Sequence, residues 1–154
     1  MSNPKDLADT CDIGFDATHL VRDTCLCLHL QRAARAVSRR FDAAFRPLDL
    51  TNQQFSLLMS LNRPGPATMR SVATLLAMDR TTLTAALKPL ARRGLVGIAA
   101  DPADRRSKHL ALTAAGRRLL AAALPIWRQE HAALDALLAD RGAERLRAGL
   151  LALG

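Results

Sequence analysis

The sequence has no long apolar run. A helix that crosses a bilayer needs about 20 consecutive apolar residues, whereas the best candidate, residues 119–127, is interrupted by Pro125. Residues 1–12 are polar and carry several acids, so we expect no secretory signal there. These absences predict that the protein has no membrane partner.

Groups for covalent and metal chemistry are also scarce. The chain has three cysteines in 154 residues, an odd number that offers no disulfide framework and favours a reducing cytoplasm. No nucleophile–base arrangement, glycine-rich phosphate loop or metal-ligand spacing is visible, so we expect no cofactor and no metal. An enzyme is therefore only a remote alternative. No repeat, low-complexity tract or interdomain linker divides the chain, which predicts one domain.

Basic residues exceed acidic ones. The sequence has 22 Lys and Arg against 14 Asp and Glu, a net charge of +8. Such a balance favours a polyanionic partner, nucleic acid above all. The alternative is an Arg-rich coding background, in which the arginines only solvate the surface.

Residues 68–113 have the pattern of a helix, a turn, a second helix and a hairpin. Thr68 and Asp79 are placed to cap the two helices, and Thr51 and Thr113 to cap the helices before and after this unit. The first helix has a short apolar stripe formed by Val72, Leu75 and Leu76. The second has a buried face formed by Leu83, Leu87 and Leu90. Gly94 is a natural stop for the second helix.

The outward face of the second helix contains no acid. At about 100° per residue it carries Thr81, Ala85, Lys88 and Arg92, flanked by Thr84. Threonines can bond base edges or phosphates, Ala85 can approach a thymine methyl, and Lys88 and Arg92 can neutralise phosphates. This composition suits a helix inserted in the major groove of DNA. An ordinary solvated face is the alternative for these residues in isolation.

A hairpin follows the second helix. Residues 95–98 and 110–112 are strand candidates around a turn at 101–107, which carries Arg105 and Arg106. Guanidinium groups suit the negative potential of a narrow minor groove. A basic hairpin beside a groove-reading helix is a winged helix-turn-helix. The sequence therefore predicts a mainly α fold with a small β-hairpin wing.

The runs RTTLTAALKPLARRGLV and DPADRRSKHLALTAAG resemble the MarR family of bacterial transcription regulators. The family pattern Leu-x-x-x-Gly-Leu-Val falls on residues 90–96, Asp-x-Arg on residues 104–106, and Leu-Thr-x-x-Gly on residues 112–116. The flanking helices extend the resemblance to roughly residues 19–153. One departure is Pro89, whose ring should bend the last turn of the second helix.

The resemblance implies a chain organisation. We expect a flexible arm at residues 1–18 and a single domain at 19–154. Within it, the winged unit covers about 51–113, and dimerisation helices cover about 19–46 and 114–153. The terminal helices carry more apolar surface than one small winged unit could cover, so a homodimer would bury the excess. Two-fold symmetry then predicts a pseudo-palindromic operator.

The implied function is a ligand-responsive repressor that binds double-stranded DNA. The predicted DNA contacts are Arg70, Ser71, Arg80, Thr81, Thr82, Thr84, Lys88, Arg92, Asp104, Arg105 and Arg106. Asp104 is expected to orient a neighbouring arginine. MarR-like proteins bind small amphipathic effectors between the dimer helices and the winged unit. Here the wall of that pocket would come from Cys27, Leu30, Phe55 and Met59.

The cysteines leave an alternative open, a regulator of the same fold that senses oxidants or soft metals. Cys25 and His29 are spaced i, i+4, and Cys11 on the arm could assist them. Cys27 falls beside the apolar stripe of the first helix, where we expect a buried and inert thiol.

Overall fold

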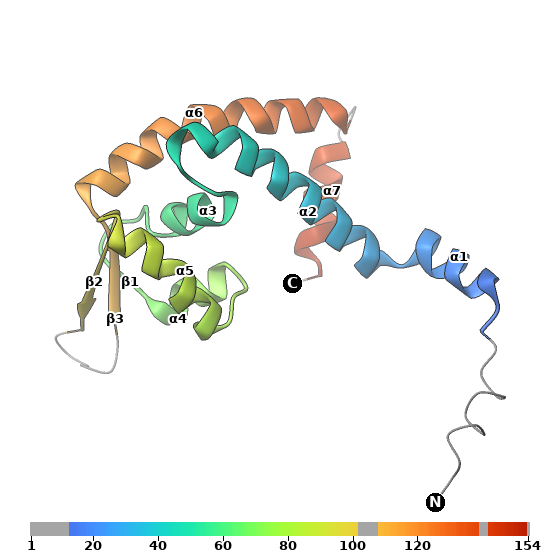
Figure 1. The fold of residues 1–154 in the computed structure, drawn as a ribbon, viewed down its shortest axis with the longest axis horizontal. Coiled ribbons are helices and arrows are strands. Elements are labelled where there is room, and N and C mark those ends of the chain that lie inside the picture. Colours follow the sequence, from blue (N-terminus) through green and yellow to red (C-terminus); the bar gives the residue numbers. More distant parts are fainter. Residues whose placement is uncertain (1–12, 102–107, 139–141, 154) are drawn as a thin grey trace, which may run out of the picture. The chain divides into compact units, whose positions relative to one another are not determined.

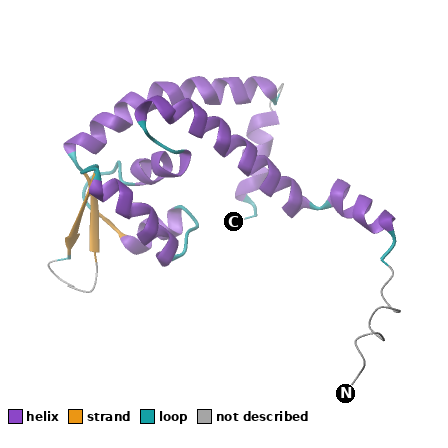
Figure 2. Cartoon of the chain, viewed as in Figure 1, coloured by secondary structure: helices purple, strands orange, loops and turns teal. Residues whose placement is uncertain are grey.

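A computed structural model describes residues 13–101, 108–138 and 142–153 of the chain. The chain divides into two compact units, residues 1–37 and 38–154. Helices dominate, and the strands form one small sheet (Figures 1 and 2). This confirms the predicted fold class, a mainly α protein with a β-hairpin wing.

The first unit contains α1 (Phe15–Thr24) and the beginning of α2 (Leu26–Phe45). One uninterrupted helix over about residues 19–46 is therefore not observed, since helix begins at Phe15 and is interrupted at Cys25. Cys25 has an extended ψ of 105°, and its sulfur accepts the backbone N–H of Leu28 at 3.5 Å. Cys25 thus ends one helix and caps the next. Of the expected arm, residues 1–12 lie outside the described residues.

The second unit holds the remaining elements. Its helices are the end of α2, the 3₁₀ turn η1 (Arg46–Leu48), α3 (Asn52–Ser60), α4 (Met69–Leu75), α5 (Arg80–Arg92), α6 (Ala114–Leu137) and α7 (Gly142–Leu151). Helix α6 continues through Pro125 and changes direction along its course (Figure 1). Within the described ranges, no helix is both long enough and apolar enough to cross a membrane.

Side-chain caps begin four of these helices, as the sequence predicts. Thr51, Thr68, Asp79 and Thr113 each accept the backbone N–H three residues ahead, at 2.8–3.2 Å. Gln54 and Ser71 complete reciprocal capping boxes with Thr51 and Thr68. Local hydrogen bonds therefore determine where α3, α4, α5 and α6 begin.

The sheet is antiparallel, with strand order β1-β3-β2. Its strands are β1 (Ala67–Thr68), β2 (Val96–Ala100) and β3 (Lys108–Leu112). Val96 pairs with Leu112, and Ile98 with Leu110, so β2 and β3 form the predicted hairpin. Strand β1 was not expected from the sequence, because two residues are too few to show a period.

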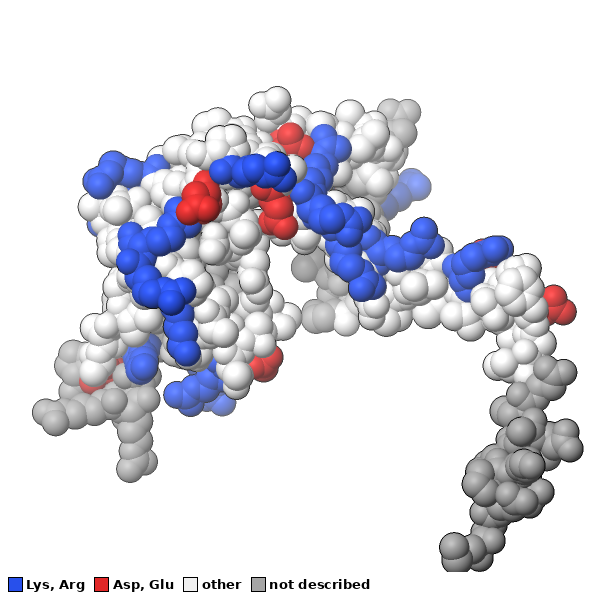
Figure 3. Space-filling model, viewed as in Figure 1, with Lys and Arg blue, Asp and Glu red and all other residues white. Residues whose placement is uncertain are grey.

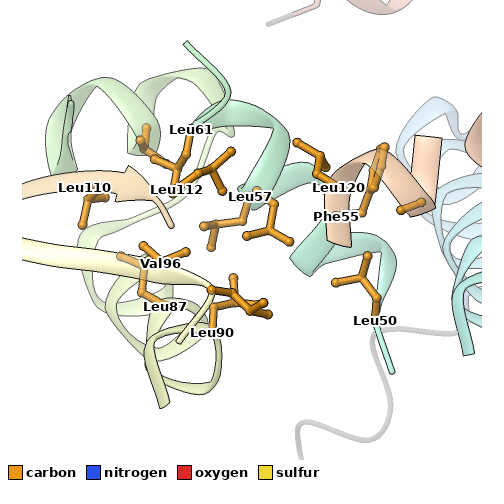
Figure 4. Packing of buried hydrophobic residues seen from close by; sticks show 14 of the residues in the cluster. Leu50, Phe55, Leu57, Leu61, Leu87, Leu90, Val96, Leu110, Leu112 and Leu120 are labelled. Carbon is orange, nitrogen blue, oxygen red and sulfur yellow. The ribbon is translucent and has the colours of Figure 1, made fainter. Parts of the chain in front are cut away.

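The core joins α3, α5, α6 and the sheet. Figure 4 shows leucines of α3, α5 and the strands turned toward one another. Leu83, Leu87 and Leu90 are buried as predicted. Leu75 is not, since 68% of it is exposed and only Val72 of α4 is fully buried. Helix α4 ends at Leu75, so this residue lies at the rim of the core and not inside it.

Candidate nucleic-acid interface

Helix α5 presents one face to solvent. The exposed residues are Arg80, Thr81, Thr82, Thr84, Ala85, Lys88 and Arg92. Its leucines Leu83, Leu87 and Leu90 are buried, so packing determines which side faces outward. The helix contains no acid. Figure 3 shows Lys and Arg side chains gathered over the region where α5 lies in Figure 1.

Asp79 holds the first turn of α5. Its Oδ1 accepts the backbone N–H of Thr82 at 2.8 Å, and its Oδ2 accepts the Thr82 hydroxyl at 2.6 Å. These hydrogen bonds, with that from the hydroxyl contributing most, hold the pKa of Asp79 below its ordinary value. Asp79 therefore both caps α5 and holds the side chain of Thr82, whereas the sequence predicted only the cap.

Thr84 also uses its hydroxyl within the helix, donating to the carbonyl of Arg80 at 2.7 Å. The Thr81 hydroxyl, in contrast, makes no hydrogen bond to any residue that the structure describes. Three threonines that look equivalent in the sequence therefore have different hydrogen-bonding capacity.

Hydrogen bonds connect the end of α5 to the segment between α2 and α3. Arg93 donates from Nη1 to the carbonyl of Asp49 at 2.5 Å and from Nη2 to that of Leu48 at 3.4 Å. Pro89 lies inside α5 and removes one backbone donor, yet the helix continues to Arg92. Gly94 then stops it with a φ of +66°. The Arg93 contact joins segments 44 residues apart, which is why no local pattern predicts it.

Helix α6 begins in direct contact with the residues that follow α5. Thr113 donates from Oγ1 to the Gly94 carbonyl at 2.6 Å and from its backbone N–H to the Leu95 carbonyl at 3.1 Å. A Cβ on Gly116 would lie 2.1 Å from that same Leu95 oxygen. Only glycine fits there. The Leu-Thr-x-x-Gly motif therefore has a structural role that the sequence did not reveal.

Two predicted contacts lie on α4, where Arg70 and Ser71 are both exposed. Ser71 donates its hydroxyl to the Thr68 carbonyl at 3.0 Å and accepts the Thr68 backbone N–H at 3.2 Å. Its hydrogen is therefore used in the cap of α4. Arg70 has no such engagement among the described residues.

The predicted wing contacts Asp104, Arg105 and Arg106 lie outside the described residues. The strands that lead to them are described. His109 of β3 lies with Nε2 at 3.1 Å from a carboxylate oxygen of Asp101, next to the end of β2. This contact joins the two strands at the base of the wing.

The four predicted effector-pocket residues are divided between the units. Cys27 and Leu30 belong to the first unit. In the second, Phe55 is buried and stacks on Phe45 with ring centroids 4.8 Å apart. Met59 lines a cavity of about 260 Å³ together with Asn62, Arg117, Leu120, Ala121 and Leu124. Of the predicted wall, Met59 alone is among the residues that line this cavity.

The predicted sensor thiols are partly described. Cys25 is half-buried, and Cys27 is exposed, so the expectation that Cys27 is buried is wrong. Among the described residues of this unit none is fully buried, so no packed layer there covers the Cys27 side chain. His29 donates from Nδ1 to the carbonyl of Cys25, not to its thiol, at 2.8 Å. No group of three metal-binding side chains lies together among the described residues, and Cys11 is not one of them.

The sequence of residues 50–116 matches the protein family described as the winged helix DNA-binding domain. The transcriptional regulator MosR of Mycobacterium tuberculosis, solved in complex with DNA, is 39% identical, with a TM-score of 0.76 over 84% of this chain and 92% of that one. A MarR family regulator from Rhodococcus sp. RHA1 is 25% identical, with a TM-score of 0.76 over 85% and 93% of the two chains.

Curated relatives match over a shorter stretch. The transcriptional repressor NicR of Pseudomonas putida is 36% identical over 80 residues, which is 52% of this chain. The match spans about half the length of such relatives, 51% for NicR. The matched structures extend beyond the winged unit to the flanking helices. The chain therefore belongs to the MarR family of winged helix-turn-helix transcription regulators.

Proposed function

We propose that the protein is a homodimeric transcription regulator that binds double-stranded DNA sequence-specifically and represses transcription until an effector binds. The observation that carries this proposal is the acid-free, exposed face of α5, held outward by three buried leucines. The family of the chain and the DNA complex of the similar MosR support it.

Five of the exposed side chains of α5 have a proposed role here. Lys88 and Arg92 neutralise phosphates, Thr81 and Ala85 lie against base edges, and Arg80 contacts the backbone. Arg70 of α4 adds a phosphate contact. For Arg105 and Arg106 we keep the proposal that they enter the minor groove, with Asp104 orienting one of them, which is an inference from the sequence.

A second copy of the chain is the proposed partner for the exposed apolar side chains of the C-terminal helices. Among these, Leu137 is 72% exposed and Leu151 79%, with Leu138, Leu146 and Leu150 nearby in sequence. Several large apolar side chains exposed on neighbouring helices favour an interface. A two-fold dimer would present two α5 helices to one duplex, and the operator would be pseudo-palindromic.

The cavity beside Met59 is the proposed effector site. Its wall is apolar at Leu120 and Leu124, while Arg117 and Asn62 supply polar groups. A small amphipathic molecule suits such a site. Its binding would change the spacing of the two α5 helices and weaken the operator complex. We further propose that the protein acts in the cytoplasm as a regulator and not as an enzyme.

A salt titration tests the DNA-binding proposal. An operator is first selected from random duplexes, and affinities are then measured by fluorescence anisotropy at several salt concentrations. Lys88→Ala should weaken binding and reduce the slope of log K against log salt by about 1.8, since one phosphate contact is lost from each subunit of the dimer. Arg128→Ala, which removes an exposed arginine of α6, should leave that slope unchanged. Equal slopes for both variants would contradict the proposed role of α5.

A further inference from the structure

The threonines of α5 differ in how their hydroxyl hydrogens are used. Thr82 Oγ1 lies 2.6 Å from Oδ2 of Asp79, and Thr84 Oγ1 lies 2.7 Å from the carbonyl oxygen of Arg80. A carboxylate and a carbonyl have no hydrogen to give, so the threonine is the donor in both pairs. A hydroxyl has one hydrogen. Each of these two is therefore already used inside the helix.

Both hydroxyls can still accept a hydrogen bond. Thr82 and Thr84 are exposed, and a hydroxyl oxygen keeps lone pairs after its hydrogen has been donated. Phosphate oxygens also only accept, so they cannot pair with these hydroxyls while the internal bonds hold. In the major groove the donors are the N6 amino group of adenine and the N4 amino group of cytosine.

We infer that Thr82 and Thr84 read adenine or cytosine amino groups through their hydroxyl oxygens and make no phosphate contact. The inference rests on the proposed DNA-binding function. Because every base pair presents one such amino group in the major groove, it specifies which atom each threonine contacts, and so on which strand, rather than which base pair is present. It also revises the expectation from the sequence that any of the threonines could bind either a base or a phosphate.

We expect both internal hydrogen bonds to persist when DNA binds, for different reasons. Thr82 donates to an ionised carboxylate, and hydrogen bonds to ionised groups are about twice as strong as neutral ones. Thr84 donates to the carbonyl four residues earlier, a bond that holds the side chain in one of its preferred helical rotamers. Thr81 differs from both, since its hydroxyl is not engaged by any described residue and can donate to an acceptor on a base edge.

Thr82 and Thr84 lie at opposite edges of the outward face of α5. With about 100° per residue, Thr81 and Ala85 occupy the centre of the face, with Thr82 on one side and Thr84 on the other. The two acceptors therefore meet different base edges. We expect two separate base pairs in each half-site at which affinity depends on the amino group of the adenine or cytosine.

Binding-site selection tests the inference. Wild type, Thr82→Val and Thr84→Val each select duplexes from a random pool, with Thr82→Ser and Thr84→Ser as matched controls that keep the hydroxyl. Each Val variant should lose the preference at one base pair of each half-site, and its affinity for the wild-type site should fall about ten- to hundredfold, as for one lost hydrogen bond per subunit. The Ser variants should keep the preference. Thermal unfolding followed by circular dichroism identifies any variant whose loss of binding comes from a loss of fold.

A base analogue keeps the test independent of protein stability. Where wild type selects adenine, purine is substituted, which lacks only the 6-amino group; where it selects cytosine, 2-pyrimidinone is substituted. With the analogue in both half-sites, wild type should lose about ten- to hundredfold in affinity, and the Val variant should lose nothing further. Wild-type affinity that is unchanged by the analogue on either strand of the selected pairs would overturn the inference, as would identical selection by wild type and the Val variants. A wild-type protein that selects no sequence would contradict the proposed function itself.

Discussion

At the scale of single residues, the tightest constraint described is at Gly116, where α6 passes the Leu95 carbonyl. We expect Gly116→Ala to destabilise the protein by about 1–3 kcal/mol, because the added Cβ forces two backbone segments apart. Urea unfolding followed by circular dichroism measures the change.

Gly149 offers a matched control for this substitution. A Cβ at Gly149 of α7 would meet no atom within 4 Å, so Gly149→Ala should be neutral or stabilise the protein by up to about 1 kcal/mol through helix propensity. Equal unfolding midpoints for the two variants would show that the close approach at Gly116 is not a constraint.

A second residue-scale prediction concerns pH. The pKa of Asp79 is lowered in the folded protein, so its carboxylate stabilises the fold above the ordinary carboxyl pKa, and this contribution is lost as pH falls through the lowered pKa. Asp79→Ala should therefore lower the melting temperature at neutral pH and have a diminishing effect in acid. Asp79→Asn keeps an uncharged cap, so its advantage over Ala should not depend on pH. A difference between wild type and Ala that stays constant with pH would refute this role.

At the scale of elements, features that depend on neighbouring residues could be predicted from the sequence. The caps at Thr51, Thr68, Asp79 and Thr113 and the buried leucines of α5 are local or periodic, and all are confirmed. The two-residue strand β1 and the interruption at Cys25 were missed, because they depend on a distant strand and on one residue's backbone angle.

The same distinction holds within the candidate site. The outward face of α5 follows from helical spacing, and its exposure is confirmed for every residue that the sequence placed there. How Thr82 and Thr84 use their hydroxyls depends on side-chain rotamers, which spacing does not specify. The position of Ala77 in the turn between α4 and α5, with φ of +50°, likewise carries no signal in an alanine.

The prediction at the scale of elements concerns Arg93, which holds the end of α5. Arg93→Ala should destabilise the protein by about 1–2 kcal/mol, because two carbonyl contacts of a charged donor are lost. Operator affinity should fall with it, while the salt slope should stay at the wild-type value, since Arg93 holds the end of α5 and does not neutralise a phosphate.

Arg93→Lys is the companion variant. It keeps the charge but cannot donate to two carbonyls in the same fork, so it should resemble Ala in the urea midpoint. Anisotropy titrations over a range of salt provide the second readout. A slope reduced by about 1.8 in Arg93→Ala, one phosphate contact per subunit, would instead assign this residue to DNA contact.

At the scale of the whole molecule, the proposed dimer depends on the exposed leucines of the terminal helices. Leu146→Asp places a charge on the exposed face of α7 and should shift the protein from dimer to monomer in sedimentation velocity, with weaker operator binding. Leu75→Asp, at an even more exposed leucine of α4, should leave the mass unchanged. A wild-type monomer at micromolar concentration would contradict the proposed assembly.

The most direct test attaches a cleavage reagent to α5. In a variant whose three cysteines are replaced by serine, Arg92→Cys carries a tethered iron–EDTA group, and Arg128→Cys carries the same group on α6 as a control. If paired α5 helices lie in successive major grooves, the first variant should cut the selected operator in two clusters about 10 base pairs apart, and the control should not. A single cluster, or the same cutting pattern from both tethers, would contradict the central claim that two α5 helices read one duplex.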